Sequence, residues 1–172
     1  MGERSVTRKE LLGGGAVAGA VALGAAPAAY AHGGGDDDGD AIVGSYTGTV
    51  TATDPPLGSF ADLISFHTGG VVTESRRYYV PVTPLGPLLE TTGHGAWKRT
   101  GSRSYEAFFR FLLQQAPPSA GEPVGTDNIR LKLRLERGGE RFSGTFESNI
   151  RDNTGAVVFT ARGTITGERI EV

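Results

Sequence analysis

Residues 129–146 read IRLKLRLERGGERFSGTF and carry the clearest structural signal in the chain. Apolar and charged residues alternate strictly from Ile129 to Leu135, so the apolar side chains would face one way and the cations the other. This period of two is typical of a half-buried β-strand. Gly138-Gly139 then predicts a tight hairpin, because glycine adopts the backbone conformations that such turns require. The alternation resumes after the turn, which predicts a second, antiparallel strand.

The same rhythm extends from residue 42 almost to the end of the chain. One short helical turn is expected at 84–90, and the connections 81–93 and 115–127 are long and rich in Pro and Gly. Short turns between successive strands favour an all-β fold, an eight-stranded, mostly antiparallel up-and-down barrel without exposed edges. A β-sandwich is the alternative. The predicted strands are 42–53, 60–67, 71–80, 94–100, 103–114, 128–137, 140–151 and 156–169.

Residues 1–31 have the features of an export signal peptide. A charged start precedes an apolar run rich in Gly and Ala, and Ala29-Tyr30-Ala31 has the A-x-A form of a cleavage site. The segment SVTRKELL at 5–12 resembles the signal of the twin-arginine route, with Lys9 where that signal has its second arginine. We therefore expect cleavage after Ala31 and an exported protein, secreted or held in the cell envelope, with no membrane span after cleavage.

The remaining chain divides into a flexible Gly/Asp-rich leader at 32–41 and a barrel domain at 42–172. The absence of cysteine excludes disulfides, thiolate metal sites and a cysteine nucleophile. Residues 41–172 carry 14 Lys and Arg against 13 Asp and Glu. Nucleic-acid binding normally requires a basic excess, so this balance argues against a nucleic-acid partner. No sequence feature defines an oligomeric state.

Gly44-Ser45-Tyr46, at the start of the first predicted strand, resembles the G-x-W opening of lipocalins and other calycin barrels. In that family the aromatic residue packs beneath a basic residue from the last strand, so the resemblance implies a contact between Tyr46 and Arg169. The pattern over 42–170 is also similar to small exported bacterial barrels of lipocalin-like or allene-oxide-cyclase-like type. That similarity implies either a bound small molecule or a cofactor-independent cyclase or isomerase.

Alternation places seven aromatic residues and one arginine on the predicted inner face. Glycines share those faces, so bulky rings beside glycines would either fill the core or leave a pocket, and eight strands allow both. These residues are the candidates for lining a ligand pocket: Tyr46, Trp97, Tyr105, Phe109, Phe111, Phe142, Phe146 and Arg169.

The histidines give weaker indications. His94 has the opposite parity to Trp97, so it would point outward, as a rim residue, unless a bulge at a neighbouring glycine changes the register. His67 adjoins a turn and reads as solvated. His32 would become the N-terminus after cleavage, but it sits on a flexible leader without a second fixed histidine opposite. We therefore predict neither a metal site nor a cofactor.

The carboxylates and cations read as an outer surface. Glu74, Glu106, Glu136 and Glu147 occupy positions expected to face solvent, and no nucleophile motif occurs, so no catalytic residue is assigned. The leading hypothesis is an exported barrel that binds a small apolar or amphipathic molecule. The alternatives are a cyclase or isomerase using the cavity, and a non-catalytic partner-binding protein with an outer stripe of Arg130, Lys132, Arg134 and Arg141.

Overall fold

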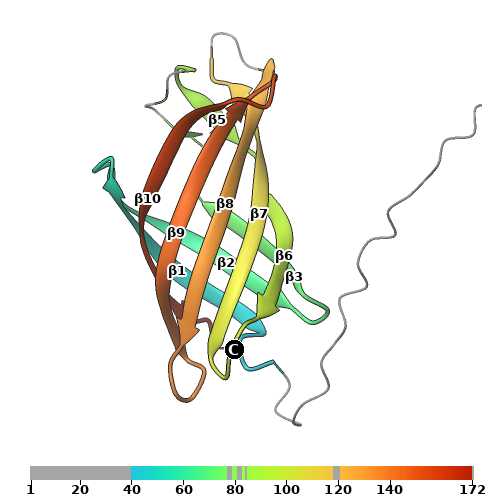
Figure 1. Ribbon diagram of the computed structural model, residues 1–172, viewed down its shortest axis with the longest axis vertical. Helices are drawn as coiled ribbons and strands as arrows, with labels where there is room; N and C mark the ends of the chain where they lie inside the picture. Colours follow the sequence, from blue (N-terminus) through green and yellow to red (C-terminus); the bar gives the residue numbers. More distant parts are fainter. Residues whose placement is uncertain (1–39, 77–78, 81–82, 84, 118–120, 172) are drawn as a thin grey trace, which may run out of the picture. The chain divides into compact units, whose positions relative to one another are not determined.

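The computed structural model describes residues 40–76, 79–80, 83, 85–117 and 121–171. The described part contains ten β-strands, and every strand pairing in it is antiparallel (Figure 1). The strands are β1 (Gly44–Asp54), β2 (Gly58–His67), β3 (Val71–Arg76), β4 (Tyr79–Val80), β5 (Leu88–Glu90), β6 (Gly93–Arg99), β7 (Ser104–Gln115), β8 (Pro123–Leu135), β9 (Arg141–Asp152) and β10 (Val157–Arg169). Within the described residues, no helix is long and apolar enough to span a membrane.

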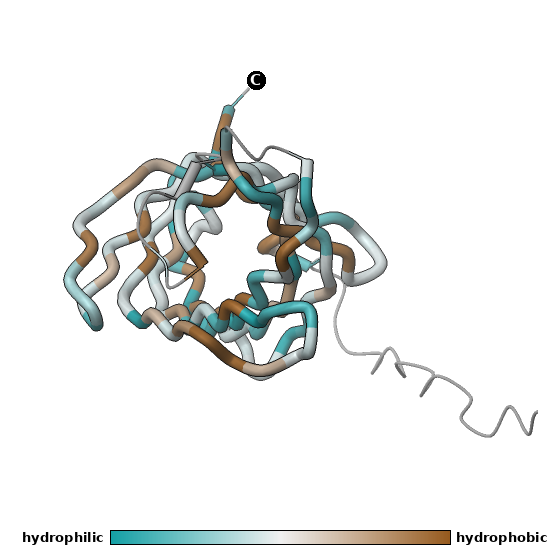
Figure 2. The backbone as a smooth tube through the Cα atoms, turned by 90° about the horizontal axis from the view of Figure 1, so that it is seen from above, coloured by the Kyte–Doolittle hydropathy of each residue, from teal (hydrophilic) through white to brown (hydrophobic). Residues whose placement is uncertain are grey.

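Eight of these strands close into a barrel. Their order around it is β1-β2-β3-β6-β7-β8-β9-β10, and β10 pairs with β1 to complete the ring. Each strand therefore neighbours the next one in the chain, except between β3 and β6, where β4 and β5 intervene. Figure 2 looks into this ring from one end. The prediction of an all-β, antiparallel, up-and-down barrel is confirmed.

The strands β4 and β5 form a small extension of the barrel wall. β5 pairs with the last part of β7, directly beyond the stretch of β7 that pairs with β6. The helical turn predicted at 84–90 is wrong, because Leu88 and Glu90 are buried and alternate as strand residues while Leu89 pairs with β4. The long connection expected at 115–127 is also shorter, since β8 begins at Pro123.

Alternation positions the core as predicted. On β8 the residues from Ile129 to Leu135 alternate between buried and exposed, with every leucine inside and every cation outside. The predicted export signal at 1–31, and the leader up to residue 39 with His32, lie outside the described residues. Ile42, just before β1, is completely buried.

The two ends of the barrel interior differ, and we name each after a residue. The Tyr46 end lies where β1 begins and β10 ends, and the Glu90 end lies where β1 ends and β10 begins. Beside the main core, a smaller apolar cluster at the Glu90 end contains Leu88, Leu113 and Ile150. Charged side chains lie between these two apolar regions.

Candidate functional site

The seven aromatic residues predicted to face inward are all buried, with at most 7% of any one exposed. At the Tyr46 end they pack edge to face: the ring of Tyr46 lies 5.1 Å from that of Phe142, and Trp97 lies 5.8 Å from Tyr105. The indole N–H of Trp97 donates to the backbone oxygen of His67. Such contacts stabilise a core beyond the area they bury.

Glycines create the space for these rings. At the Tyr46 end, a Cβ atom added at Gly167 would collide with the ring of Phe142. Nearer the Glu90 end, one added at Gly93 would lie 2.9 Å from the ring of Phe111. Both distances are shorter than ordinary carbon contacts, so a side chain at either position would displace the ring.

Arg169 closes the Tyr46 end. Its guanidinium donates to the hydroxyl oxygen of Tyr46 at 2.6 Å and lies over the ring of that residue. It also donates to the backbone oxygens of Ala41, Val43 and Gly139, and so connects the segment before β1 with the hairpin between β8 and β9. The contact between Tyr46 and Arg169 that the calycin resemblance implies is therefore present.

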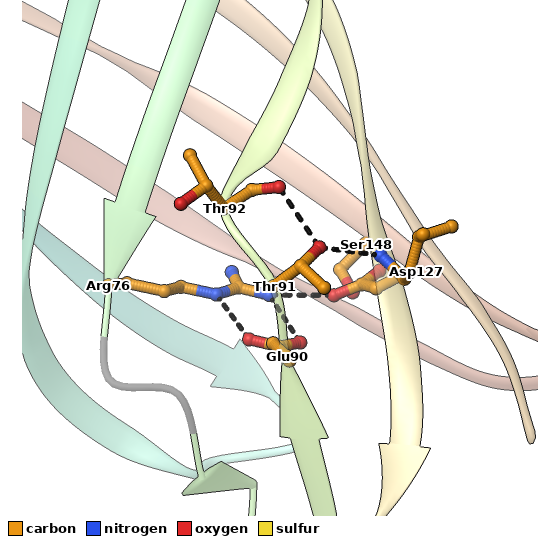
Figure 3. Close-up of polar contacts among 7 residues, drawn as sticks. Arg76, Glu90, Thr91, Thr92, Asp127 and Ser148 are labelled. Atoms are coloured by element: carbon orange, nitrogen blue, oxygen red, sulfur yellow. Dashed lines mark hydrogen bonds and ion pairs between the residues drawn. The ribbon is translucent and has the colours of Figure 1, made fainter. Parts of the chain in front are cut away.

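A second arginine, Arg76, organises the Glu90 end. Figure 3 shows its guanidinium between carboxylates from two other strands. It donates two bonds of 2.9 Å to Glu90 on β5 and one of 2.7 Å to Asp127 on β8. Ser148 on β9 donates a hydrogen bond to the other oxygen of Asp127. The ring of Phe111 lies 4.4 Å from the guanidinium carbon, so the cation also contacts an aromatic face.

Two further carboxyl groups complete the cluster, Asp62 on β2 and Glu74 on β3. Only 3% of Asp62 and 2% of Glu74 is exposed, and the pKa of each carboxyl depends on the other. The prediction that Glu74 faces solvent is wrong. It lies on the same side of β3 as Val72, which is fully buried, so the pleat carries its carboxyl into the barrel. We call Asp62 and Glu74 the acid pair.

The acid pair faces a small interior space of about 10 Å³. This is about the volume that one water molecule requires. Among the described residues, both carboxyl oxygens of Asp62 and one of Glu74 have no hydrogen-bond partner. The walls are formed by the acid pair, Arg76 and six apolar side chains, namely Val50, Phe109, Ile129, Leu131, Phe146 and Ile165.

Burial controls the ionisation of the cluster. Removal from water raises the pKa of Asp62 to about 6, although Glu74 and Arg76 oppose the shift. Burial likewise raises the pKa of Glu74 well above its usual range, and it raises that of Glu90 despite Arg76. For Arg76, burial lowers the pKa, but the surrounding carboxylates outweigh it and hold the pKa well above its usual value. Arg76 therefore stays charged, while the acid pair is able to hold a proton.

The other residues singled out from the sequence lie outside the barrel. His94 is exposed on the outer face of β6, opposite Arg110 of β7, and has the parity predicted relative to Trp97. His67 is exposed and within 3.2 Å of the hydroxyl of Thr73. Neither histidine approaches the cluster. Among the described residues, no group of three or more His, Asp or Glu is arranged to hold a metal ion.

The outer stripe of cations lies among acidic and aromatic neighbours. Arg130 covers the ring of Phe108, and Arg141 forms an ion pair of 2.7 Å with Glu168. Lys132 lies opposite Glu106 of β7 in the register of the sheet. The cations are exposed as predicted, but neighbouring groups on adjacent strands offset two of their charges.

The acid pair and its partners are the part of the site that sequence reasoning missed, although alternation contained the signal. Asp62 has the parity of Ile64 and Phe66, and Asp127 has the parity of Ile129 and Leu131. The same alternation that predicts inward-facing apolar residues therefore also predicts that these two carboxylates face inward.

Comparisons of the chain with protein-family models, curated proteins and solved structures gave no match.

Proposed function

We propose that this protein is an exported β-barrel that binds one small amphipathic molecule at the Glu90 end of its interior. The observation that carries the proposal is the acid pair, since three of its buried oxygens line a small apolar space and accept no hydrogen bond from the described residues. Buried polar groups in proteins are nearly always hydrogen-bonded. Ligand sites are typically apolar spaces with a few converging polar groups, and this arrangement has that composition.

The apolar part of the ligand would lie among half-buried side chains near the Glu90 end. Phe60 is half-buried beside Arg76, and Phe159 packs against both apolar clusters of the barrel. The interior space beside the acid pair accepts only a water-sized group, so the polar end of the ligand would enter it while the remainder stays outside. Entry requires displacement of side chains.

Export is supported by residues 1–31. The charged start, the apolar Gly- and Ala-rich run and the A-x-A sequence ending at Ala31 form the composition of a cleavable signal.

Binding is tested by calorimetry with 1-octanol, a neutral amphiphile with a small polar end, titrated into the full chain. We expect saturable binding of one probe molecule, weakened about tenfold or more by Phe60→Ser or Phe159→Ser, because each removes apolar contact surface worth at least 1.4 kcal/mol. His94→Ala on the outer wall serves as the control and should bind normally. Absence of saturable binding, or equal binding by all variants, would contradict the proposal.

A second candidate, an isomerase or cyclase, is favoured by one observation. The acid pair places two carboxyls with raised pKa values beside the same apolar space, so one is able to donate a proton while the other accepts one. Such an enzyme would exchange a carbon-bound proton of its ligand with solvent deuterium. Glu74→Gln would then stop the exchange but leave binding in place, whereas a carrier would return its ligand without deuterium.

A further inference from the structure

The charges at the Glu90 end do not balance. Arg76 is the one cation of the cluster, and its guanidinium is matched by Glu90 and Asp127 at 2.9 and 2.7 Å. Arg76 lies opposite Asp62 in the register of β2 and β3 and lowers the pKa of both members of the acid pair, but among the described residues it forms ion pairs only with Glu90 and Asp127. One guanidinium thus serves four buried carboxyls, so even with one proton on the acid pair the cluster keeps a net negative charge. Buried charges are normally paired, so an uncompensated carboxylate in apolar surroundings favours a cationic partner.

The acid pair is aimed into the space and not turned away from it. Asp62 and Glu74 both form part of its wall, and the three unpartnered oxygens belong to these two residues. Gly48 makes this position accessible, since a Cβ atom at that residue would collide with a carboxyl oxygen of Asp62. The carboxyl of Asp62 therefore lies directly against the backbone of β1, on the inner side of the barrel.

Size and chemistry restrict what this space accepts. About 10 Å³ admits one water-sized group, which excludes a guanidinium or an aromatic ring. An anion would meet two carboxyls, and an apolar group would leave their oxygens unpaired. A divalent metal ion prefers six or more oxygen ligands or a set of nitrogen and sulfur ligands, and the described residues offer no such group. A primary ammonium group is water-sized, carries one positive charge and has three N–H donors.

We propose that the acid pair binds the primary ammonium group of an amphipathic amine, whose apolar chain extends toward Phe60 and Phe159. This inference rests on the proposed function and specifies the class of its ligand. The ammonium group donates to Asp62 and Glu74, and its charge offsets the carboxylate that Arg76 leaves uncompensated. The aromatic rings at the Glu90 end cover the first carbons of the chain.

The experiment compares three ligands with the same chain length, octylamine, 1-octanol and octanoate, each titrated into the full chain by calorimetry at neutral pH. Octylamine is protonated there and octanoate is ionised. We expect octylamine to bind at least tenfold more tightly than 1-octanol, and octanoate to bind most weakly. Asp62→Asn and Glu74→Gln should each remove most of the preference for the amine, while the affinity for 1-octanol changes less than threefold.

Glu106→Gln is the matched control, because it neutralises a carboxylate on the outer face of β7. It should leave all three affinities unchanged. Equal binding of octylamine and 1-octanol would overturn the amine inference and leave the proposed function standing. A preference for octanoate would overturn it as well and would identify Arg76 as the recognition group. If none of the three binds, the proposed function fails too. Since neutral replacements remove buried charge, the variants should fold, and circular dichroism verifies this.

Discussion

At the Tyr46 end Arg169 meets uncharged oxygens, whereas at the Glu90 end Arg76 meets carboxyl groups. Arg169 is half-buried, and its partners are three backbone carbonyls and the hydroxyl of Tyr46. Arg76 bonds two buried carboxylates and lies beside the acid pair. Both arginines lie against aromatic rings, so the difference is in the charge of their partners. One arrangement stabilises a closed end, and the other retains unsatisfied groups at a position suited to a ligand.

The largest expected effect comes from Arg76→Met. Removing the guanidinium leaves Glu90 and Asp127 buried without their cation, which typically destabilises a protein by about 3–5 kcal/mol. Urea unfolding at pH 7 measures this, with Arg162→Met as the control. Arg162 forms exposed ion pairs with Asp54 and Glu147, so its replacement should cost about 1 kcal/mol or less. If both variants lost the same free energy of unfolding, Arg76 would stabilise the fold no more than an exposed ion pair does.

Arg169→Met is expected to have a smaller effect, about 2 kcal/mol, because its lost hydrogen bonds lead to neutral and partly solvated acceptors. The decrease in the free energy of unfolding caused by Arg169→Met should be the same at pH 5 and pH 7. The decrease caused by Arg76→Met should be smaller at pH 5, because the carboxyls left without a cation then take up protons. The two variants should thus differ in how their destabilisation depends on pH. A pH-dependent destabilisation by Arg169→Met would contradict this difference between the two ends.

The smallest effect concerns the acid pair in the unmodified protein. Burial raises the pKa of Asp62 from 3.8 to about 6, so the folded state binds this proton more tightly than the unfolded state. Asp62 alone should therefore increase the stability by about 1 kcal/mol as the pH falls from 7 to 5, and the raised pKa of Glu74 adds to the increase. Asp62→Asn should remove the contribution of Asp62 to this dependence and raise the stability at pH 7. Denaturation midpoints across this range test both, and a stability that decreases between pH 7 and 5 would contradict the assigned direction.

The fold was predictable because one physical rule governs most of the chain. Strands with one buried face must alternate, and the segments from Ile129 to Leu135 and from Tyr105 to Leu113 do so without interruption. The insertion of β4 and β5 between β3 and β6 was not predictable in the same way. Leu88–Glu90 is too short to display a period, so its pairing with β7 depends on a distant segment that local sequence does not specify.

The inner face of the barrel was predictable, but the carboxylates on it were not, and of the predicted pocket residues only Phe109 and Phe146 line the space beside the acid pair. The inner face was correctly assigned, and it contains Asp62 and Glu74 by the same parity that places Ile64 and Val72. Residue type suggested solvent for Glu74, because an isolated carboxylate is rarely buried. Only the structure brings Arg76, Glu90 and Asp127 from three separate strands to one point, and that convergence is what allows carboxyl groups inside an apolar barrel.

The bond network around Arg169 also has a practical consequence for handling the protein. Ala41 and Arg169 are hydrogen-bonded to each other, so the chain enters and leaves the barrel at the same end. A linker attached before Asp40 or after Ile170 would leave the Glu90 end pointing away from any surface to which the protein is tethered. A protein immobilised by such a linker would present its Glu90 end to the solution, where libraries of small amines can be screened.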